Sequence, residues 1–354
     1  MKFVDYILVG QGIAGSVLFS KLQERGKKVV VYNSDPIESS SRVAAGIFNP
    51  VTGKKMVKTW IADKLWPVFT EFYQNLEKKS GQRFFYEIPQ YRPFLSHQEM
   101  VQQANGDAEG YGQFLEKVIT TPLLGKSIIN PYGGLLIRKT GYIDVGIFLD
   151  YVKSLIVEEG YLEEKKINNS DIQIEDDHVI VGQYKSKHLI FCNGWTAENS
   201  DFFGWLPFSP VKGEVLHTTN DMGLDLLVNR GVFVLPHHDG LLRIGATYEH
   251  KTLDFVPTED ARNKLLDKFS GLIDKPTEVK SQKAGVRPST RDRRPFVGLH
   301  PEHKTIGIFN GLGTKGLSLA PYFAEELIAF IENNSRISTE ANIERYYSLY
   351  LSPK

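Results

Sequence analysis

The feature that most constrains this chain is a glycine motif that follows an apolar segment near its start. Residues 6–16 read YILVGQGIAGS, so Gly10, Gly12 and Gly15 have the spacing GxGxxG after a predicted strand over 3–9. In a βαβ unit with this motif, the first glycine allows a tight turn and the second lets the backbone approach a pyrophosphate. The third glycine lets the next helix pack closely on the sheet. The segment therefore predicts a Rossmann-like unit that binds a dinucleotide.

The residue after the second predicted strand departs from the usual pattern. A helix over 14–25 and a strand over 27–32 complete the unit, and Asn33 follows where a carboxylate normally binds the ribose hydroxyls. The Asn33 amide oxygen can accept one such hydrogen bond, but without the help of a charge. Because no arginine stands there for a 2′-phosphate, the position favours FAD or NAD over NADP.

The composition is that of a globular protein and narrows the range of partners. A length of 354 residues, 41% of them hydrophobic and 24% charged, predicts two domains. Lys and Arg together number 42, as do Asp and Glu, so no net charge draws the chain to nucleic acid or an anionic membrane. The single cysteine, Cys192, excludes an intramolecular disulfide and a cysteine metal cluster. With no leader-like segment and no long apolar run, we expect a cytoplasmic protein without a membrane span.

A second glycine-rich turn occurs near the other end of the chain. Residues 305–321 read TIGIFNGLGTKGLSLAP, a predicted strand, a turn with Gly311, Gly313 and Gly316, and a predicted helix over 318–332. One pyrophosphate needs only one cradle of backbone N–H groups at a helix N-terminus. A second cradle indicates a longer cofactor whose far end, such as a flavin ring, needs donors of its own.

Six segments in a fixed order resemble the D-amino acid oxidase superfamily of FAD-dependent oxidoreductases, which includes glycine oxidase, sarcosine oxidase and D-amino acid dehydrogenase. The resemblance covers nearly the whole chain. Besides the first glycine motif, its segments are SSRVAAGIFNP (40–50), TGYID (140–144), HLIFCNGW (188–195), PVKGEVL with LPHHDGLLRIGAT (210–216 and 235–247), and GVRP with GLGTKGLS (285–288 and 311–318).

The resemblance implies an α/β fold made of two interleaved domains. The Rossmann-like FAD-binding domain would comprise residues 1–80, 141–205 and 285–354. A substrate domain with a mainly antiparallel β-sheet would comprise residues 81–140 and 206–284, and would lie over the flavin.

The same resemblance implies the residues that contact the cofactor. Covalent attachment of the flavin is not expected, because residues 310–320 contain no cysteine and residues 38–50 contain no histidine. Noncovalent FAD would contact Gly10, Gly12, Ile13, Ala14, Gly15, Asn33, Ser41, Arg42, Ala45, Gly46, Ile47, Ile167, Asn193, Gly194, Trp195, Gly311, Gly313, Thr314, Lys315, Gly316, Leu317 and Ser318.

Arg287, in the segment GVRP, matches the arginine that binds the substrate carboxylate in this family. A planar guanidinium holds a carboxylate through two parallel hydrogen bonds, which fixes its orientation as well as its position. The alternative is an ordinary surface ion pair. Tyr248 is a further candidate for a substrate contact, because Phe233 stands where a relative carries a tyrosine.

Two more candidates come from the segment LPHHDGLLRIGAT. Strand alternation would place Arg243 on the same side as Gly245 and Thr247, where it would act near the flavin, contact substrate, or pair with a carboxylate. Consecutive strand residues point to opposite faces, so His237 and His238 are not expected to share a metal ion. We expect no metal site, and His237 remains a candidate to face the active site.

These residues predict an FAD-dependent oxidoreductase that oxidises the C–N bond of an amino acid or secondary amine by hydride transfer to flavin N5. Oxygen or another electron acceptor would regenerate the flavin. An alternative is the related oxidase that modifies a tRNA wobble uridine at a carboxymethylamine, for which Lys54, Lys55 and Lys58 offer phosphate contacts. Another is a flavin-binding partner protein without amine chemistry. The arginines at 291, 293 and 294 are expected to decorate a loop.

Overall fold

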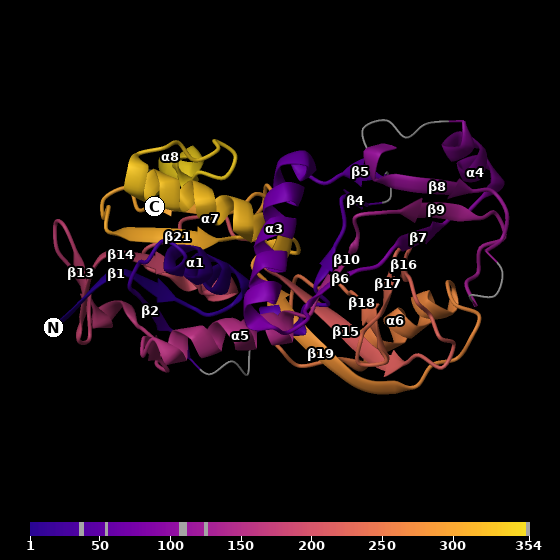
Figure 1. Ribbon diagram of the computed structural model, residues 1–354, viewed down its shortest axis with the longest axis horizontal. Coiled ribbons are helices and arrows are strands. Elements are labelled where there is room, and N and C mark those ends of the chain that lie inside the picture. Colours follow the sequence, from indigo (N-terminus) through magenta and orange to yellow (C-terminus); the bar gives the residue numbers. More distant parts are fainter. Residues whose placement is uncertain (35–38, 54–55, 106–111, 124–126, 352–354) are drawn as a thin grey trace.

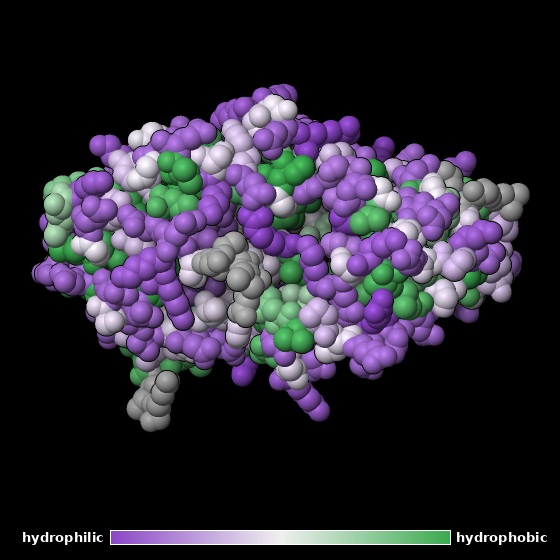
Figure 2. Space-filling view, turned by 90° about the horizontal axis from the view of Figure 1, so that it is seen from below, coloured by the Kyte–Doolittle hydropathy of each residue, from purple (hydrophilic) through white to green (hydrophobic). Residues whose placement is uncertain are grey.

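The protein is elongated, with one large β-sheet toward each end (Figure 1). The computed structural model describes residues 1–34, 39–53, 56–105, 112–123 and 127–351. Within these residues no helix is long and apolar enough to cross a membrane. The face seen in Figure 2 is mostly hydrophilic, with hydrophobic side chains in separate groups.

The first sheet is built around the N-terminal strand. β1 (Lys2–Val9) lies between β2 (Val29–Tyr32) and β14 (Tyr184–Phe191), and both pairs are parallel. β21 (Ile306–Asn310) is also parallel to β14 and pairs with its carboxyl-terminal half. The predicted Rossmann-like arrangement is confirmed. The remaining strands of this sheet are β11 (Leu162–Glu163), β12 (Ile172–Ile174), β13 (Val179–Val181) and β20 (Phe296–Leu299).

Helices pack against this sheet and against one another. α1 (Ile13–Gln23) follows β1 directly and contacts both α5 (Val145–Glu158) and α7 (Gly316–Asn333). α3 (Ala62–Ser80) packs on α7 and stands between the two ends of the molecule in Figure 1. This order brings the N-terminal and C-terminal segments of the chain together.

Neighbouring residues of β1 belong to two separate cores. Ile7 packs in a cluster that includes Val30, and Leu8 packs in another that includes Val31; all four side chains are fully buried. A parallel sheet needs cover on both faces, so its strands read as continuous apolar runs rather than as alternating ones. The apolar run in β1 is continuous because both faces of the strand are covered.

The second sheet is mainly antiparallel, as expected for the substrate domain. β15 (Val211–Thr219) lies between β19 (Val279–Arg287) and β18 (Leu241–Gly245). α6 (Glu259–Ser270) packs on this sheet through buried apolar residues. The expected domain boundary at residue 285 falls within β19. The sheet also contains β17 (Phe233–Pro236), β16 (Leu227–Asn229), β7 (Gln90–Pro93), β9 (Gly134–Ile137) and β8 (Leu115–Ile119).

A short helix connects the two sheets. α2 (Ser40–Val43) contacts β19, so the loop after β2 meets the edge of the second sheet. The other short elements are β3 (Ile47–Phe48), β4 (Val51–Thr52), β5 (Val57–Lys58), β6 (Phe85–Glu87), β10 (Gly141–Ile143), α4 (His97–Ala104) and α8 (Tyr347–Leu351). Short 3-10 helices cover Gly112–Phe114, Asn169–Asp171, Gly194–Asn199 and Ile343–Tyr346.

Candidate functional site

The first glycine turn has no room for side chains. Gly10 has a positive φ of 102°, and a Cβ there would lie 2.8 Å from the carbonyl oxygen of Cys192. A Cβ on Gly15 would lie 1.9 Å from the carbonyl oxygen of Gly10. The turn is therefore pressed between α1 and the end of β14, as the glycine spacing predicts.

The N-terminus of α1 presents backbone N–H groups and no negative charge. Gly12 is the N-cap, and the first turn, which includes Ile13 and Ala14, contains no acidic residue. Ser41 lies over this end, because its Oγ accepts a hydrogen bond from the Ile13 N–H at 3.1 Å. Such a helix end attracts a phosphate through its free donors and its partial positive charge.

Asn33 lies at the carboxyl end of β2, beside the first glycine turn. Its Oδ1 accepts a hydrogen bond from the backbone N–H of Gln11 at 2.9 Å. A carbonyl oxygen has two lone pairs, so one acceptor position remains for a ribose hydroxyl.

The second glycine turn meets the first. Gly311 and Gly313 both have positive φ, 71° and 56°. A Cβ on Gly316 would lie 3.5 Å from Cγ2 of Ile13, so the N-terminus of α7 adjoins that of α1. Two helix N-termini from opposite ends of the sequence thus lie side by side.

Asn310 connects the second glycine turn to the segment CNGW (192–195), which directly follows β14. Its Oδ1 accepts from the Gly311 N–H and its Nδ2 donates to the Gly194 carbonyl, both at 2.8 Å. Asn193 and Trp195 lie half-buried on either side of Gly194. Asn310 is not predicted from the sequence, because a buried asparagine at a strand end carries no motif of its own.

Lys315 is the N-cap of α7 and is half-buried. Its Nζ donates to Oγ1 of Thr59 at 2.7 Å, and no carboxylate in the described part of the chain forms an ion pair with it. Burial lowers the pKa of Lys315 to about 8. Thr314 beside it is exposed, whereas Leu317 and Ser318 are buried in the first turn of α7.

The remaining predicted cofactor contacts lie in three places. Gly46 has a positive φ, and a Cβ there would lie 1.9 Å from the carbonyl oxygen of Ile143, which fixes Ala45 and Ile47 beside β10. Arg42 pairs with Asp150 on α5, at 2.6 Å. Ile167 lines a cavity of about 280 Å³ whose other walls include Tyr32 and Gly182.

These features fit FAD. The strand-to-helix turns exclude side chains, two helix N-termini adjoin, and neither helix has an acidic residue in its first turn. An extended anionic dinucleotide with a flavin at its far end requires such a surface.

Arg287 is a half-buried cation without an acidic partner. Its Nη1 donates to the carbonyl oxygens of Thr247 at 3.2 Å and Lys212 at 3.5 Å, and its guanidinium lies over the ring of the exposed Tyr248, 4.7 Å from the centroid. Burial lowers the pKa of the guanidinium. Among the described residues no carboxylate pairs with Arg287. Gly213 lies directly beneath the guanidinium of Arg287. No sequence pattern predicts this contact.

Arg243 lies in a different part of the same sheet. Arg243 on β18 pairs with His217 of β15, whereas Arg287 on β19 pairs with Val211 of the same strand. Six residues separate these positions, roughly 20 Å along a strand. Arg243 forms an ion pair with Asp239, and although burial acts in the opposite direction, this hydrogen bond holds the pKa of Asp239 down at about 2. The four predicted catalytic residues therefore form two pairs, Arg287 with Tyr248 and Arg243 with His237.

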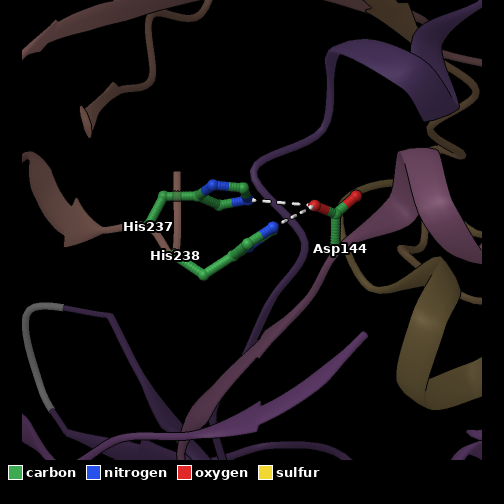
Figure 3. A group of neighbouring side chains, drawn as sticks. All are labelled: Asp144, His237 and His238. Atoms are coloured by element: carbon green, nitrogen blue, oxygen red, sulfur yellow. Dashed lines mark ion pairs between the residues drawn. The ribbon is translucent and has the colours of Figure 1, made fainter. Parts of the chain in front are cut away.

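The expectation that His237 and His238 point apart is wrong. β17 ends at Pro236, so both histidines belong to the turn before β18, where strand alternation does not apply. Their rings lie 4.4 Å apart, and both point toward Asp144 at the start of α5 (Figure 3). Asp144 is not predicted from the sequence as a partner of these histidines, because it lies more than 90 residues before them.

Two of the basic residues that the sequence analysis considered, Lys58 and Arg294, have local partners. Lys58 pairs with Asp63 at 2.6 Å, and Lys54 and Lys55 lie outside the described residues. Arg294 stacks over Trp60 and approaches Glu340 at 3.5 Å. Arg291 is exposed, and Arg293 has a positive φ of 59° in the same loop.

Comparison with known proteins places the chain in a defined group. The family model described as FAD dependent oxidoreductase (DAO) matches residues 5–330. Glycine oxidase from Bacillus licheniformis is 30% identical over 160 residues, 43% of this chain and 43% of that protein. The tRNA 5-methylaminomethyl-2-thiouridine biosynthesis bifunctional protein MnmC from Shewanella sp. strain W3-18-1 is 27% identical over 227 residues, 51% of this chain and 33% of that protein. These matches span less than half of either relative.

A solved structure extends the likeness in fold to the whole chain. The crystal structure of glycine oxidase from Geobacillus kaustophilus superposes with a TM-score of 0.80 at 18% identity and covers 98% of both chains. The superposition includes both sheets and therefore both ends of the molecule.

Proposed function

The chain belongs to the family of FAD-dependent oxidoreductases, and we propose that it oxidises the C–N bond of an amino acid or secondary amine that carries a carboxylate. FAD, when bound, supplies the acceptor for the hydride at its N5 atom. The protein supplies a binding surface for the cofactor and a group that orients the substrate.

The proposal rests on Arg287, a half-buried cation that pairs with no carboxylate among the described residues. A partly buried charge without an acidic partner is costly, and a bound anion would offset that cost. Two backbone carbonyls already hold Nη1, which leaves Nε and Nη2 as one edge of the guanidinium. That edge matches the two oxygens of a carboxylate.

The position of Arg287 relative to the cofactor surface supports the same role. Gly285 lies two residues before Arg287, and a Cβ on it would lie 3.2 Å from Cβ of Val43 in α2. The Ser40 hydroxyl also donates to the carbonyl oxygen of Val286. The end of β19 thus rests on the loop that follows the first nucleotide-binding unit, so a carboxylate held by Arg287 lies at the junction of the two sheets.

Orientation is the main contribution we assign to Arg287. A carboxylate fixed at two points limits rotation of the substrate, so its α-hydrogen can be directed toward the cofactor. The carboxylate need not belong to a free amino acid. An N-carboxymethyl group on a larger molecule would offer the same arrangement of amine, carbon and carboxylate.

A tRNA-linked carboxymethylamine is therefore a second candidate substrate. The match to MnmC, which covers 51% of this chain, favours it. The zero net charge and the pairing of Lys58 with Asp63 weigh against a phosphate-binding surface. A flavoprotein without amine chemistry is the third reading.

Anaerobic reduction of the holoprotein separates these readings. Glycine, N-methylglycine and D-amino acids would be mixed with the FAD-loaded protein, each beside the matching amine without a carboxylate. We expect bleaching of the flavin by at least one carboxylate-bearing amine and not by its matched amine. Binding of bulk tRNA that weakens with salt, with no bleaching by free amino acids, would favour the RNA substrate. No bleaching and no tRNA binding would favour the third reading.

A further inference from the structure

Three side chains from two distant parts of the sequence converge on one point. Asp144 follows β10 and begins α5, whereas His237 and His238 lie in the turn between β17 and β18. Oδ2 of Asp144 lies 3.4 Å from Nε2 of His237 and 3.6 Å from Nε2 of His238. One ligand atom from each residue lies within 4.8 Å of the others, and Figure 3 shows both rings directed at the carboxylate.

We propose that Asp144, His237 and His238 bind a divalent transition metal ion of the Zn²⁺ type. Zinc binds imidazole nitrogen and carboxylate oxygen at about 2.0–2.1 Å in tetrahedral geometry, which separates ligand atoms by about 3.4 Å. Both N···O distances lie close to that separation. Two imidazoles and one carboxylate leave a fourth position for water.

The neighbours of these ligands fix the direction in which each ligand atom points. Nδ1 of His237 faces Asp239 and Arg243, with Oδ1 of Asp239 at 3.1 Å and Nη2 of Arg243 at 3.3 Å, so Nε2 is the ring nitrogen directed at the site. A carboxylate behind a ligating histidine is a common support in metal sites. Oδ1 of Asp144 accepts from the Ile147 N–H at 3.0 Å, which leaves Oδ2 for the ion.

His238 is held on two sides. Its backbone N–H donates to the hydroxyl of Tyr142 at 2.9 Å, and its ring stacks on the ring of Tyr86 at 4.9 Å with an interplanar angle of 7°. Tyr142 also contacts the ring of His237. The ligand set is therefore oriented before an ion arrives, which reduces the entropy lost on binding.

The site is open to solvent on one side. The side chain of His238 is 33% exposed, against 11% for His237 and 15% for Asp144. An ion can enter from that side and keep a water ligand there. Imidazole selects borderline metals such as Zn²⁺ over Mg²⁺ and Ca²⁺, which prefer all-oxygen sites.

The ligands come from two different parts of the fold. Asp144 lies at the start of a helix that packs on α1, and the histidines lie at the end of a hairpin of the second sheet. A bound ion would connect these parts directly. An ion that binds the folded state and not the unfolded one raises stability according to its affinity and concentration.

Calorimetric titration of the FAD-loaded, chelator-treated protein with Zn²⁺ tests the proposal. We expect one equivalent to bind, Mg²⁺ not to compete, and Zn²⁺ to raise the unfolding temperature. Asp144→Asn removes the charged ligand but keeps an oxygen that can cap α5. His238→Gln removes one imidazole. Each variant should lose at least tenfold in Zn²⁺ affinity and most of the thermal shift.

His303→Gln is the matched control, because His303 stacks on His300 in a second histidine pair away from Asp144. It should bind Zn²⁺ like the unmodified protein. Circular dichroism and retained FAD verify that each variant is folded. Failure of the unmodified protein to bind one equivalent, or equal binding by His238→Gln, would overturn the proposal. None of these readouts requires amine oxidation, so the metal site and the proposed function stand or fall separately.

Discussion

Gly213 and Arg287 face each other so closely that only a residue without a side chain fits beneath the guanidinium. A Cβ on Gly213 would lie 1.9 Å from Nη2 of Arg287 and 2.2 Å from its Cζ. The two residues come from neighbouring strands, because Gly213 pairs with Gly285 and Arg287 lies two positions further along β19. The absence of a side chain at 213 therefore decides where the guanidinium can lie.

Gly213→Ala should displace the guanidinium and weaken recognition of a carboxylate. We expect KM for the amino acid substrate to rise about tenfold or more, equivalent to roughly 1.4 kcal/mol, with little change for the matched simple amine. Steady-state kinetics on both substrates measure this. Gly112→Ala is the control, since nothing lies within 4 Å of a Cβ at that position. An unchanged KM in Gly213→Ala would show that the guanidinium position does not matter to binding.

Arg287→Met should retain FAD and lose affinity for carboxylate-bearing substrates. Removing one partner of a buried charge pair costs about 2–5 kcal/mol, or roughly 30- to 5000-fold in binding. Arg287→Lys keeps the charge without the planar fork and should lose less. Substrate titration of each variant gives the values. Equal losses for amino acids and simple amines would instead assign Arg287 to support of the cofactor or the fold.

Asn33→Asp should bind FAD at least as tightly as the unmodified protein. The substitution keeps an oxygen for the Gln11 N–H and adds a charge, which strengthens hydrogen bonds to hydroxyl donors. Asn33→Ala removes both functions and should weaken FAD binding by up to about tenfold. Fluorescence titration of flavin-free protein with FAD compares the three. Tighter binding by the alanine variant would exclude Asn33 as a contact.

The affinity for FAD should fall as the pH rises above about 8. Lys315 is charged below its lowered pKa and neutral above it, so its attraction for the anionic cofactor is present at low pH and lost as the pH increases. Proton linkage limits the change to about tenfold per pH unit. FAD titrations between pH 7 and 9 measure the slope. Lys315→Met should flatten it and Lys187→Met, an exposed control, should not; an equal slope in Lys315→Met would place its origin elsewhere.

Local sequence signals predicted the nucleotide-binding elements well. The helix expected over 14–25 is α1 at Ile13–Gln23, and the helix expected over 318–332 is α7 at Gly316–Asn333. Glycine spacing and apolar periodicity act over a few residues, so they can be read without knowledge of the rest of the fold.

Relationships between strands could not be read in the same way. The separation of Arg243 from Arg287 depends on how β18 and β19 register against β15, and that register is set by packing along the whole sheet. The prediction that His237 and His238 point to opposite faces is wrong for a related reason. Alternation predicts opposite faces only within a strand, and β17 ends one residue before His237.

The contact between the two glycine turns has a consequence for synthesis of the protein if both turns hold the cofactor, as we propose. The turn at residues 10–15 leaves the ribosome early, but its partner at residues 311–316 and the strand β21 that carries it come near the end of the chain. Until β21 pairs with β14, the sheet has an open edge and the nucleotide surface has only one helix. We therefore expect that a chain that ends before α7 does not bind added FAD, however well its first unit folds.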